Sequence, residues 1–98
     1  MSFTQMMTVR TSDPERLRQL MDGWHRDQHG VAPGYERARL LADRAQADQW
    51  VIEVDFSSEE EARRNSDRPE TQAWADGLRE LADGEPEYRD FELSYTTS

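Results

Sequence analysis

The segment that decides the fold runs YERARLLADRAQADQWVIEVDF from Tyr35 to Phe56. Two runs in it, Tyr35–Ala42 and Trp50–Phe56, alternate in the way that strands with one buried face do. A hairpin closed around Ala45–Ala47 gives one face an apolar ladder, with the pairs Ala42–Trp50, Leu40–Ile52 and Ala38–Val54. The other face receives two opposite-charge pairs, Arg39–Glu53 and Arg37–Asp55, and such cross-strand pairs contribute roughly 0.2–1 kcal/mol each. A slip of one residue would mix the two faces, so the pattern predicts this register.

The sequence before the hairpin predicts a strand and a helix. Phe3–Arg10 alternates loosely and is read as a strand. Ser12 is a candidate N-cap, with Glu15 three residues later as in a capping box. One apolar stripe at helical spacing follows, made of Leu17, Leu20, Met21 and Trp24. Gly30 is expected to end this helix.

The sequence after the hairpin predicts an interrupted helix and a last strand. The helix opens at Ser57–Glu61, where the acids suit the positive helix end. Asn65–Glu70 interrupts and restarts it, and Trp74, Leu78 and Leu81 form the apolar face of its second segment. Gly84-Glu85-Pro86 stops the helix. The last strand is expected at Tyr88–Thr96, with Phe91, Leu93 and Tyr95 alternating against polar residues.

The order of these elements predicts a single α+β domain over residues 1–98. It is the ferredoxin-like β-α-β-β-α-β arrangement, a four-stranded antiparallel sheet with two helices on one face. So short a chain buries only part of its surface, which favours dimerisation. We expect a homodimer through the sheet face away from the helices, where Met6, Leu41 and the paired charges lie.

Composition excludes several classes of function. The formal net charge is −9, from 21 acids and 12 bases, and every base is Arg. Such a chain repels phosphate backbones, so we expect no nucleic-acid partner. The absence of Cys removes disulfides and thiolate catalysis. The N-terminal residues show neither a signal peptide nor a membrane span, so the expected location is the cytoplasm and no membrane partner is expected.

Five residues are candidates for a ligand site between the helices and the sheet: Trp24, His25, Trp50, Asn65 and Trp74. The register and the helical stripes send the three tryptophans to the same side of the sheet. Aromatic side chains often line ligand pockets, but these three can also simply pack the core. His25 lies beside Trp24, and it is a candidate general base because imidazole side chains commonly serve in that role. Asn65 is a candidate ligand donor, or alternatively a left-handed cap that ends the first helical segment.

A metal site on the first helix is a weaker alternative. Asp22, His25 and His29 follow each other at i, i+3 and i+7, and a His pair four residues apart can bind zinc. An exposed polar face near a helix C-terminus explains the same residues. Since the sequence has no Cys and no other His, we predict no tightly bound metal.

With this element order, the hairpin from Gly34 to Phe56 and the run from Ser58 to Pro69, the sequence resembles the dimeric α/β-barrel superfamily. The relevant branch includes antibiotic-biosynthesis-monooxygenase-like proteins and uncharacterised actinobacterial proteins. The resemblance implies two sheets paired face to face into a barrel, and a pocket between each sheet and its helices. Among members, some oxidise aromatic polyketides without a cofactor, some degrade haem and some have no known activity.

The residues that such relatives use are only partly present. Haem-degrading relatives use an Asn on the first strand, a Trp on the second helix and a later His on that helix. This chain offers Trp74, but its first strand has only Gln5 as an amide and no His follows His29. Cofactor-free monooxygenases use an Asn–Trp–Tyr set, for which Asn65 and Trp74 are candidates. We therefore expect no cofactor, and no residue is assigned a catalytic role.

Two functions compete. The first is a monooxygenase-like protein with a pocket for a small aromatic or apolar ligand. The second is a non-enzymatic binding or scaffold dimer whose core is filled by its own side chains. A cavity of ligand size among the three tryptophans separates the two.

Overall fold

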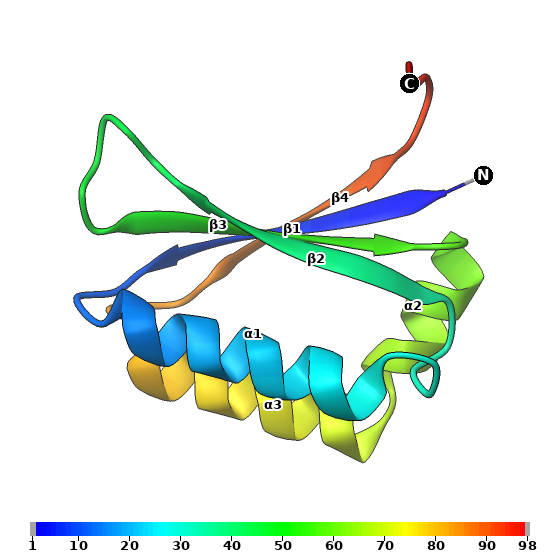
Figure 1. Ribbon diagram of the computed structural model, residues 1–98, viewed down its shortest axis with the longest axis horizontal. Helices are drawn as coiled ribbons and strands as arrows, with labels where there is room; N and C mark the ends of the chain where they lie inside the picture. The colour runs from blue at the N-terminus through cyan, green and yellow to red at the C-terminus, as the bar shows by residue number, and fades with distance from the viewer. Residues whose placement is uncertain (1, 98) are drawn as a thin grey trace.

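The computed structural model describes residues 2–97 and contains one sheet covered by helices on one face (Figure 1). The strands stand in the order β2-β3-β1-β4 and every neighbouring pair is antiparallel. The elements in chain order are β1 (Phe3–Arg10), α1 (Pro14–Gln28), β2 (Tyr35–Ala42), β3 (Gln49–Phe56), α2 (Glu59–Ser66), α3 (Pro69–Leu81) and β4 (Glu87–Glu92). This confirms the ferredoxin-like α+β fold.

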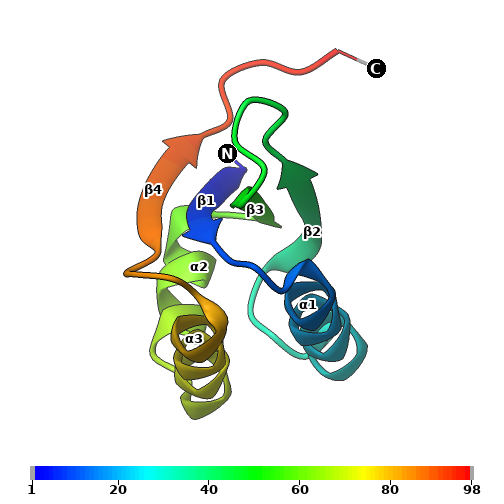
Figure 2. The same ribbon diagram turned by 90° about the vertical axis from the view of Figure 1, so that its left-hand side faces the viewer.

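The helical layer differs from the prediction in having three helices instead of two. The expected second helix is divided into α2 and α3. The division falls at Asn65–Glu70, as expected, because Pro69 begins α3 and the residue before a proline is driven out of the helical region. Arg68 accordingly has an extended backbone, with φ −80° and ψ 141°. Seen along the sheet, α1 lies beneath the β2 side and α3 beneath the β4 side (Figure 2).

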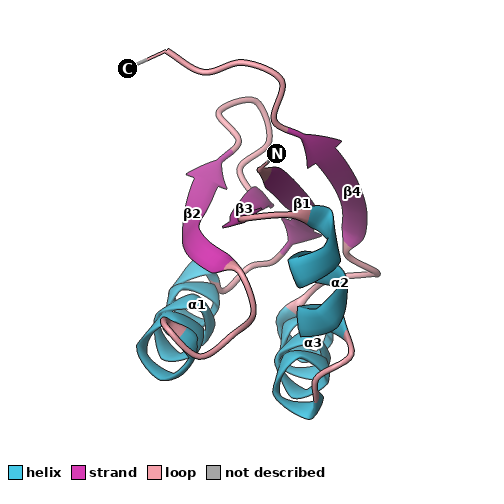
Figure 3. Cartoon of the chain, turned by 90° about the vertical axis from the view of Figure 1, so that its right-hand side faces the viewer, coloured by secondary structure: helices cyan, strands magenta, loops and turns pink. Residues whose placement is uncertain are grey.

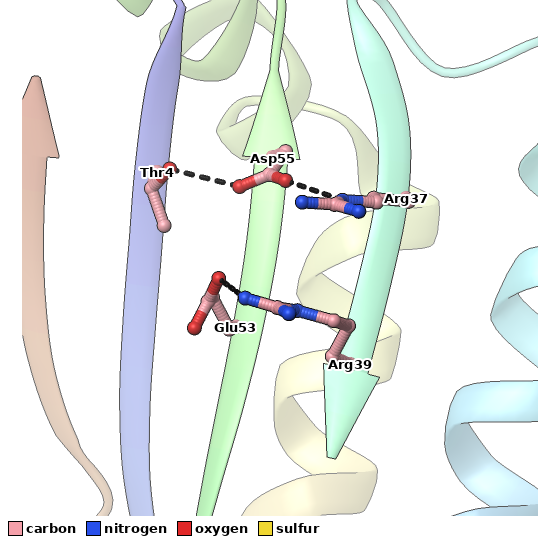
Figure 4. A network of polar contacts seen from close by, with 5 residues as sticks. All are labelled: Thr4, Arg37, Arg39, Glu53 and Asp55. Atoms are coloured by element: carbon pink, nitrogen blue, oxygen red, sulfur yellow. Dashed lines mark hydrogen bonds and ion pairs between the residues drawn. The ribbon is translucent and has the colours of Figure 1, made fainter. Parts of the chain in front are cut away.

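The hairpin register is confirmed pair by pair. Ala42 faces Trp50, Leu40 faces Ile52 and Ala38 faces Val54. The two predicted charge pairs also form on the outer face, the sheet face away from the helices. Arg37 Nε lies 2.7 Å from Asp55 Oδ2, and Arg39 pairs with Glu53 (Figure 4). Asp55 also accepts a hydrogen bond of 2.8 Å from Thr4 Oγ1, which joins β1 to the network.

The start of α1 corrects a prediction. Asp13, and not Ser12, is the N-cap, and its side chain accepts a hydrogen bond from Arg16 N. Thr11 explains the shift, since its buried hydroxyl accepts from Asp13 N at 3.0 Å and donates to Leu81 O at 2.9 Å. This one side chain therefore fixes where α1 begins and ties the end of β1 to the end of α3.

The last strand is shorter than predicted, because β4 ends at Glu92 and not at Thr96. The β1–β4 ladder reaches Phe3 opposite Glu92, and Leu93 N still donates to Ser2 O at 2.9 Å. Beyond Leu93 the alternating pattern continues, but the following residues meet no backbone partner in the described chain. They extend away from the body of the molecule (Figures 1 and 3).

The core lies between the inner face of the sheet and the helices. Its fully buried apolar side chains come from both the sheet and the helices: Val9 and Ile52 on the sheet, Leu17 on α1 and Leu78 on α3. Burying side chains of this size contributes roughly 1.5–3 kcal/mol each. No helix in residues 2–97 is both long enough and apolar enough to cross a bilayer.

Gly34, in the turn before β2, provides the first prediction. Its φ is +66°, and a Cβ there would lie 2.7 Å from Ser57 Oγ and closer still to Glu61 Cβ, whereas Gly30 has φ +84° and open space around it. Gly30→Ala therefore carries only the left-handed backbone penalty, about 1–2 kcal/mol. We expect Gly34→Ala to lower the free energy of unfolding by more than Gly30→Ala, measured by urea denaturation. Equal losses of stability in the two variants would show that α2 moves away from the new Cβ at no cost in free energy.

Candidate functional site

A cavity of about 230 Å³ opens between the inner face of the sheet and the helices. Its walls are mainly apolar and come from all three helices and from the inner face of the sheet. The apolar lining residues are Met7, Met21, Trp24, Ala38, Ile52, Val54, Phe56, Trp74 and Ala75. The predicted core is therefore not completely filled.

Two tryptophans from different helices form the aromatic wall. Trp24 of α1 meets Trp74 of α3 edge to face, with ring centroids 6.2 Å apart and planes at 62°. Trp74 Nε1 donates to Leu20 O at 3.3 Å, which fixes the indole and satisfies its only donor. The free faces of such rings suit a flat apolar molecule.

The polar lining consists of amides and hydroxyls: Gln5, Asn65, Ser66, Thr71, Gln72 and Tyr88. Asn65 is 4% exposed, and its Oδ1 accepts from Thr71 Oγ1 at 3.0 Å and from Arg68 Nη1 at 3.3 Å. None of the lining residues in the described chain carries a carboxylate, an imidazole or a guanidinium. The cavity is thus a neutral environment with hydrogen-bonding groups at its wall.

The structure brings together three of the five predicted site residues. Trp24, Asn65 and Trp74 all line the cavity. Asn65 does so from within α2, where its backbone is helical, so the alternative interpretation of a left-handed cap is wrong. No residue of the described chain other than glycine has a positive φ.

Trp50 lies outside the cavity, at the other end of the inner sheet face. It pairs with Val9 on β1 and Ala42 on β2, and the Arg18 guanidinium lies 5.6 Å from its ring centroid. Its Nε1 is buried without a hydrogen-bond partner. Trp50 therefore lies under the Arg18 side chain of α1 and is not among the residues that line the cavity.

His25 is also outside the cavity, on the far side of the aromatic wall. Its Nδ1 shares a 2.8 Å hydrogen bond with the hydroxyl of Tyr35, which is 7% exposed. The His29 ring lies 4.7 Å from the His25 ring, centroid to centroid. His25 is thus a partner of Tyr35 and is not placed to act as a general base on a ligand in the cavity.

The residues of the alternative metal site on α1 contact other side chains. Asp22 pairs with Arg26 at 3.1 Å. Between residues 2 and 97, no group of three or more His, Cys, Asp or Glu side chains is arranged to hold a metal ion. The absence of a bound metal stays a prediction.

Tyr88 and Gln5 are lining residues that the sequence analysis did not select. Tyr88 faces Met7 across the β1–β4 ladder, so it points to the inner face, and Phe91 opposite Thr4 points outward. The apolar alternation of the last strand drew attention to the outward set. Tyr88 could have been found by aligning the last strand with β1, because a residue opposite Met7 lies on the same face of the sheet as Met7.

Tyr35, behind the aromatic wall, gives a pH-dependent prediction. Burial raises the pKa of its hydroxyl above the ordinary value of 10.0. Above pH 10 the unfolded chain therefore releases a proton that the folded chain still holds, and the free energy of unfolding falls until the pH passes the raised pKa. We expect this alkaline loss of stability to be smaller in Tyr35→Phe, measured by urea denaturation from pH 8 to 11. An unchanged slope would mean that Tyr35 ionises equally in both states.

Comparison with known proteins shows likeness at the level of the fold. No protein-family model matches the sequence, and no curated protein matches it. Among solved structures, SnoaB from Streptomyces nogalater, a cofactor-independent oxygenase, has a TM-score of 0.72 at 22% identity, covering 97% of this chain and 93% of its own. A structure of SnoaB with an asparagine replaced by alanine matches with a TM-score of 0.70.

Other structural neighbours extend the same likeness. A candidate antibiotic biosynthesis monooxygenase from Caulobacter crescentus has a TM-score of 0.80 at 8% identity and covers 96% of this chain and 91% of its own. Rv0793 from Mycobacterium tuberculosis has a TM-score of 0.77 at 13% identity over 100% of both chains. The resemblance to the antibiotic-biosynthesis-monooxygenase-like fold is therefore confirmed, and this chain carries that ferredoxin-like fold over nearly its whole length.

Proposed function

We propose that the protein binds a flat aromatic molecule in the cavity between Trp24 and Trp74 and oxygenates it without a cofactor. The observation that carries the proposal is the cavity itself, which has an aromatic wall and a neutral polar lining. The filled core of the alternative hypothesis would leave no such space. The oxygenase named among the fold neighbours supports the same class of chemistry.

The lining restricts what the protein contributes to the reaction. With no carboxylate or imidazole in the cavity wall of the described chain, no side chain there serves as a base near neutral pH. The substrate itself therefore has to be acidic at the reacting carbon, as an anthrone is. In the balanced step, the reacting CH2 becomes C=O with one atom of O2, and both hydrogens leave in water with the other atom.

Two copies are proposed to associate through the outer face. The strand residues of this face include four arginines and three carboxylates, so the face carries a formal charge of only +1 although the chain carries −9: Arg10, Arg37, Arg39, Arg89, Glu53, Asp55 and Glu87. A face with so little net charge, and that charge positive, is where two copies of so acidic a chain repel each other least. Leu41 is 41% exposed there, and Phe91 is 37% exposed. If two such faces were in contact, both of these side chains would be shielded from water.

Filling the cavity tests the ligand proposal. Ala75 lines the cavity, whereas Ala73 on the same helix is exposed. We expect anthrone to quench tryptophan fluorescence and to be oxidised to anthraquinone with uptake of O2. Ala75→Leu should weaken binding at least tenfold because its side chain occupies the space, and Ala73→Leu should leave binding unchanged. Binding without O2 uptake would identify a non-enzymatic binding protein, and no binding would reject the proposal.

A charge on the outer face tests the proposed dimer. We expect sedimentation equilibrium to show a dimer at micromolar concentration. Leu41→Glu replaces an apolar side chain of the outer face by a carboxylate in both copies, which would have to lose its water in the contact, and should therefore shift the protein towards monomer. Val31→Glu is the matched control, because Val31 is 64% exposed in the loop that follows α1. A wild-type protein that stays monomeric at high micromolar concentration would contradict the proposal.

A further inference from the structure

Four ring side chains form a continuous series of contacts from the cavity to the protein surface. Trp74 and Trp24 both line the cavity, with ring centroids 6.2 Å apart. The Trp24 ring also meets the Tyr35 ring edge to face, again with centroids 6.2 Å apart. The Tyr35 hydroxyl in turn lies 2.8 Å from Nδ1 of His25, which is exposed. Edge-to-face pairs at such separations bring ring atoms close to van der Waals contact, and electrons tunnel readily over gaps of that size.

The hydrogen bond between Tyr35 and His25 has a chemically fixed direction. Tyr35 is 7% exposed, and a buried hydroxyl proton without an acceptor is costly. The phenol therefore donates to Nδ1, which places the proton of the neutral imidazole on Nε2. Burial also raises the pKa of the Tyr35 hydroxyl, so the phenol keeps its proton until it is oxidised. At that moment His25 Nδ1 is the base within hydrogen-bond reach.

Trp74 differs from Tyr35 in the group that its N–H contacts. Its Nε1 donates to the carbonyl oxygen of Leu20 at 3.3 Å. An amide oxygen is too weak a base to take the indole proton, so an oxidised Trp74 remains a radical cation, which is a strong oxidant. It therefore draws an electron from its neighbour Trp24. The oxidation comes to rest at Tyr35, because only there does the positive charge leave with a proton.

We propose that a one-electron oxidation of the cavity wall is carried to the surface by a relay of four side chains: Trp74, Trp24, Tyr35 and His25. A radical formed from O2 in the cavity takes one electron from Trp74, and Trp24 and Tyr35 each pass one electron towards it. The O–H bond of Tyr35 breaks and its proton goes to His25 Nδ1, which leaves a neutral phenoxyl radical and an imidazolium. A thiol or ascorbate in solution then returns the electron, and His25 returns the proton. The relay restores the aromatic wall, and it goes beyond the proposed oxygenation without depending on it.

Pulse radiolysis tests the relay in the absence of any ligand. The azide radical oxidises indoles in preference to phenols, and indolyl and phenoxyl radicals absorb at different wavelengths. The double variant Tyr88→Phe with Tyr95→Phe retains Tyr35 alone of the three tyrosines. We expect its phenoxyl band to grow as its indolyl band decays, at a rate independent of protein concentration. If no phenoxyl band grows, or if the rate rises in proportion to protein concentration, the relay is overturned.

Two tryptophan substitutions in this double variant test the path. Trp24→Phe removes the ring between the cavity and Tyr35, so the growth of the phenoxyl band should be lost. Trp50→Phe is the matched control, because Trp50 is not among the residues that line the cavity, and the rate of growth should stay the same. Equal rates in the two variants would overturn the path through Trp24.

His25→Gln in the same double variant tests the proton acceptor. A glutamine oxygen can accept a hydrogen bond from the phenol but cannot take its proton, so the transfer should slow by roughly a hundredfold, the low end of what a positioned base contributes. His29→Gln is the matched control, since the His29 ring lies 6.3 Å from the Tyr35 ring, centroid to centroid, without taking part in that hydrogen bond, and it should leave the rate unchanged. With His25 present, the rate should also fall when D2O replaces water, an effect that a merely structural His25 would not produce.

An unchanged rate in His25→Gln would overturn the role of His25 as proton acceptor. None of these measurements involves anthrone or any other ligand of the cavity. Failure of the relay therefore leaves the proposed oxygenation standing, and failure of anthrone to bind or react leaves the relay standing.

Discussion

The pairing of β3 with both of its neighbours is the constraint on which the rest of the structure depends. β3 lies between β1 and β2, and its residues alternate strictly between the two faces. A shift of one residue would move Ile52 and Val54 into solvent and turn Glu53 and Asp55 towards the helices. Burying unpaired carboxylates would cost several kcal/mol each. One register therefore creates both the apolar floor of the cavity and the charge pairs of the outer face.

This register was predictable because the sequence marks both faces at once. An apolar ladder alone can often be aligned in more than one way, but Arg39–Glu53 and Arg37–Asp55 agree with the apolar pairs in one alignment only. No comparable pair of independent patterns marks the ends of the helices and strands. The last strand has the right alternation up to Thr96, yet a strand persists only where a neighbour supplies backbone partners, and that neighbour is not encoded locally. Likewise, Ser12 and Asp13 are both good caps, and the distant bond between Thr11 and Leu81 decides between them.

The sequence predicted which face of the sheet carries the candidate site, but not where along that face the site lies. Alternation placed Trp50 correctly on the inner face. Alternation carries no information on distance along the strand, and Trp50 lies two residues, roughly 7 Å of strand, beyond Ile52, the last cavity-lining residue of β3 on that side. The space itself arises where small side chains, Ala38 and Ala75, stand among large ones. Such a gap is a property of packed neighbours, so a sequence pattern that marks apolar positions cannot show it.

The chain as a whole is strongly acidic, whereas the wall of its cavity is uncharged. Together these two properties restrict the class of ligand that suits the cavity. At long range the net charge of −9 repels anions, so the molecule that approaches is best neutral. Inside, the wall is mainly apolar and neutral, and its polar groups are amides and hydroxyls. A neutral aromatic molecule with one or two polar groups satisfies both conditions. Because many functions share this fold, it is this combination of an acidic surface and a neutral cavity, more than the fold, that supports a neutral aromatic ligand as proposed above.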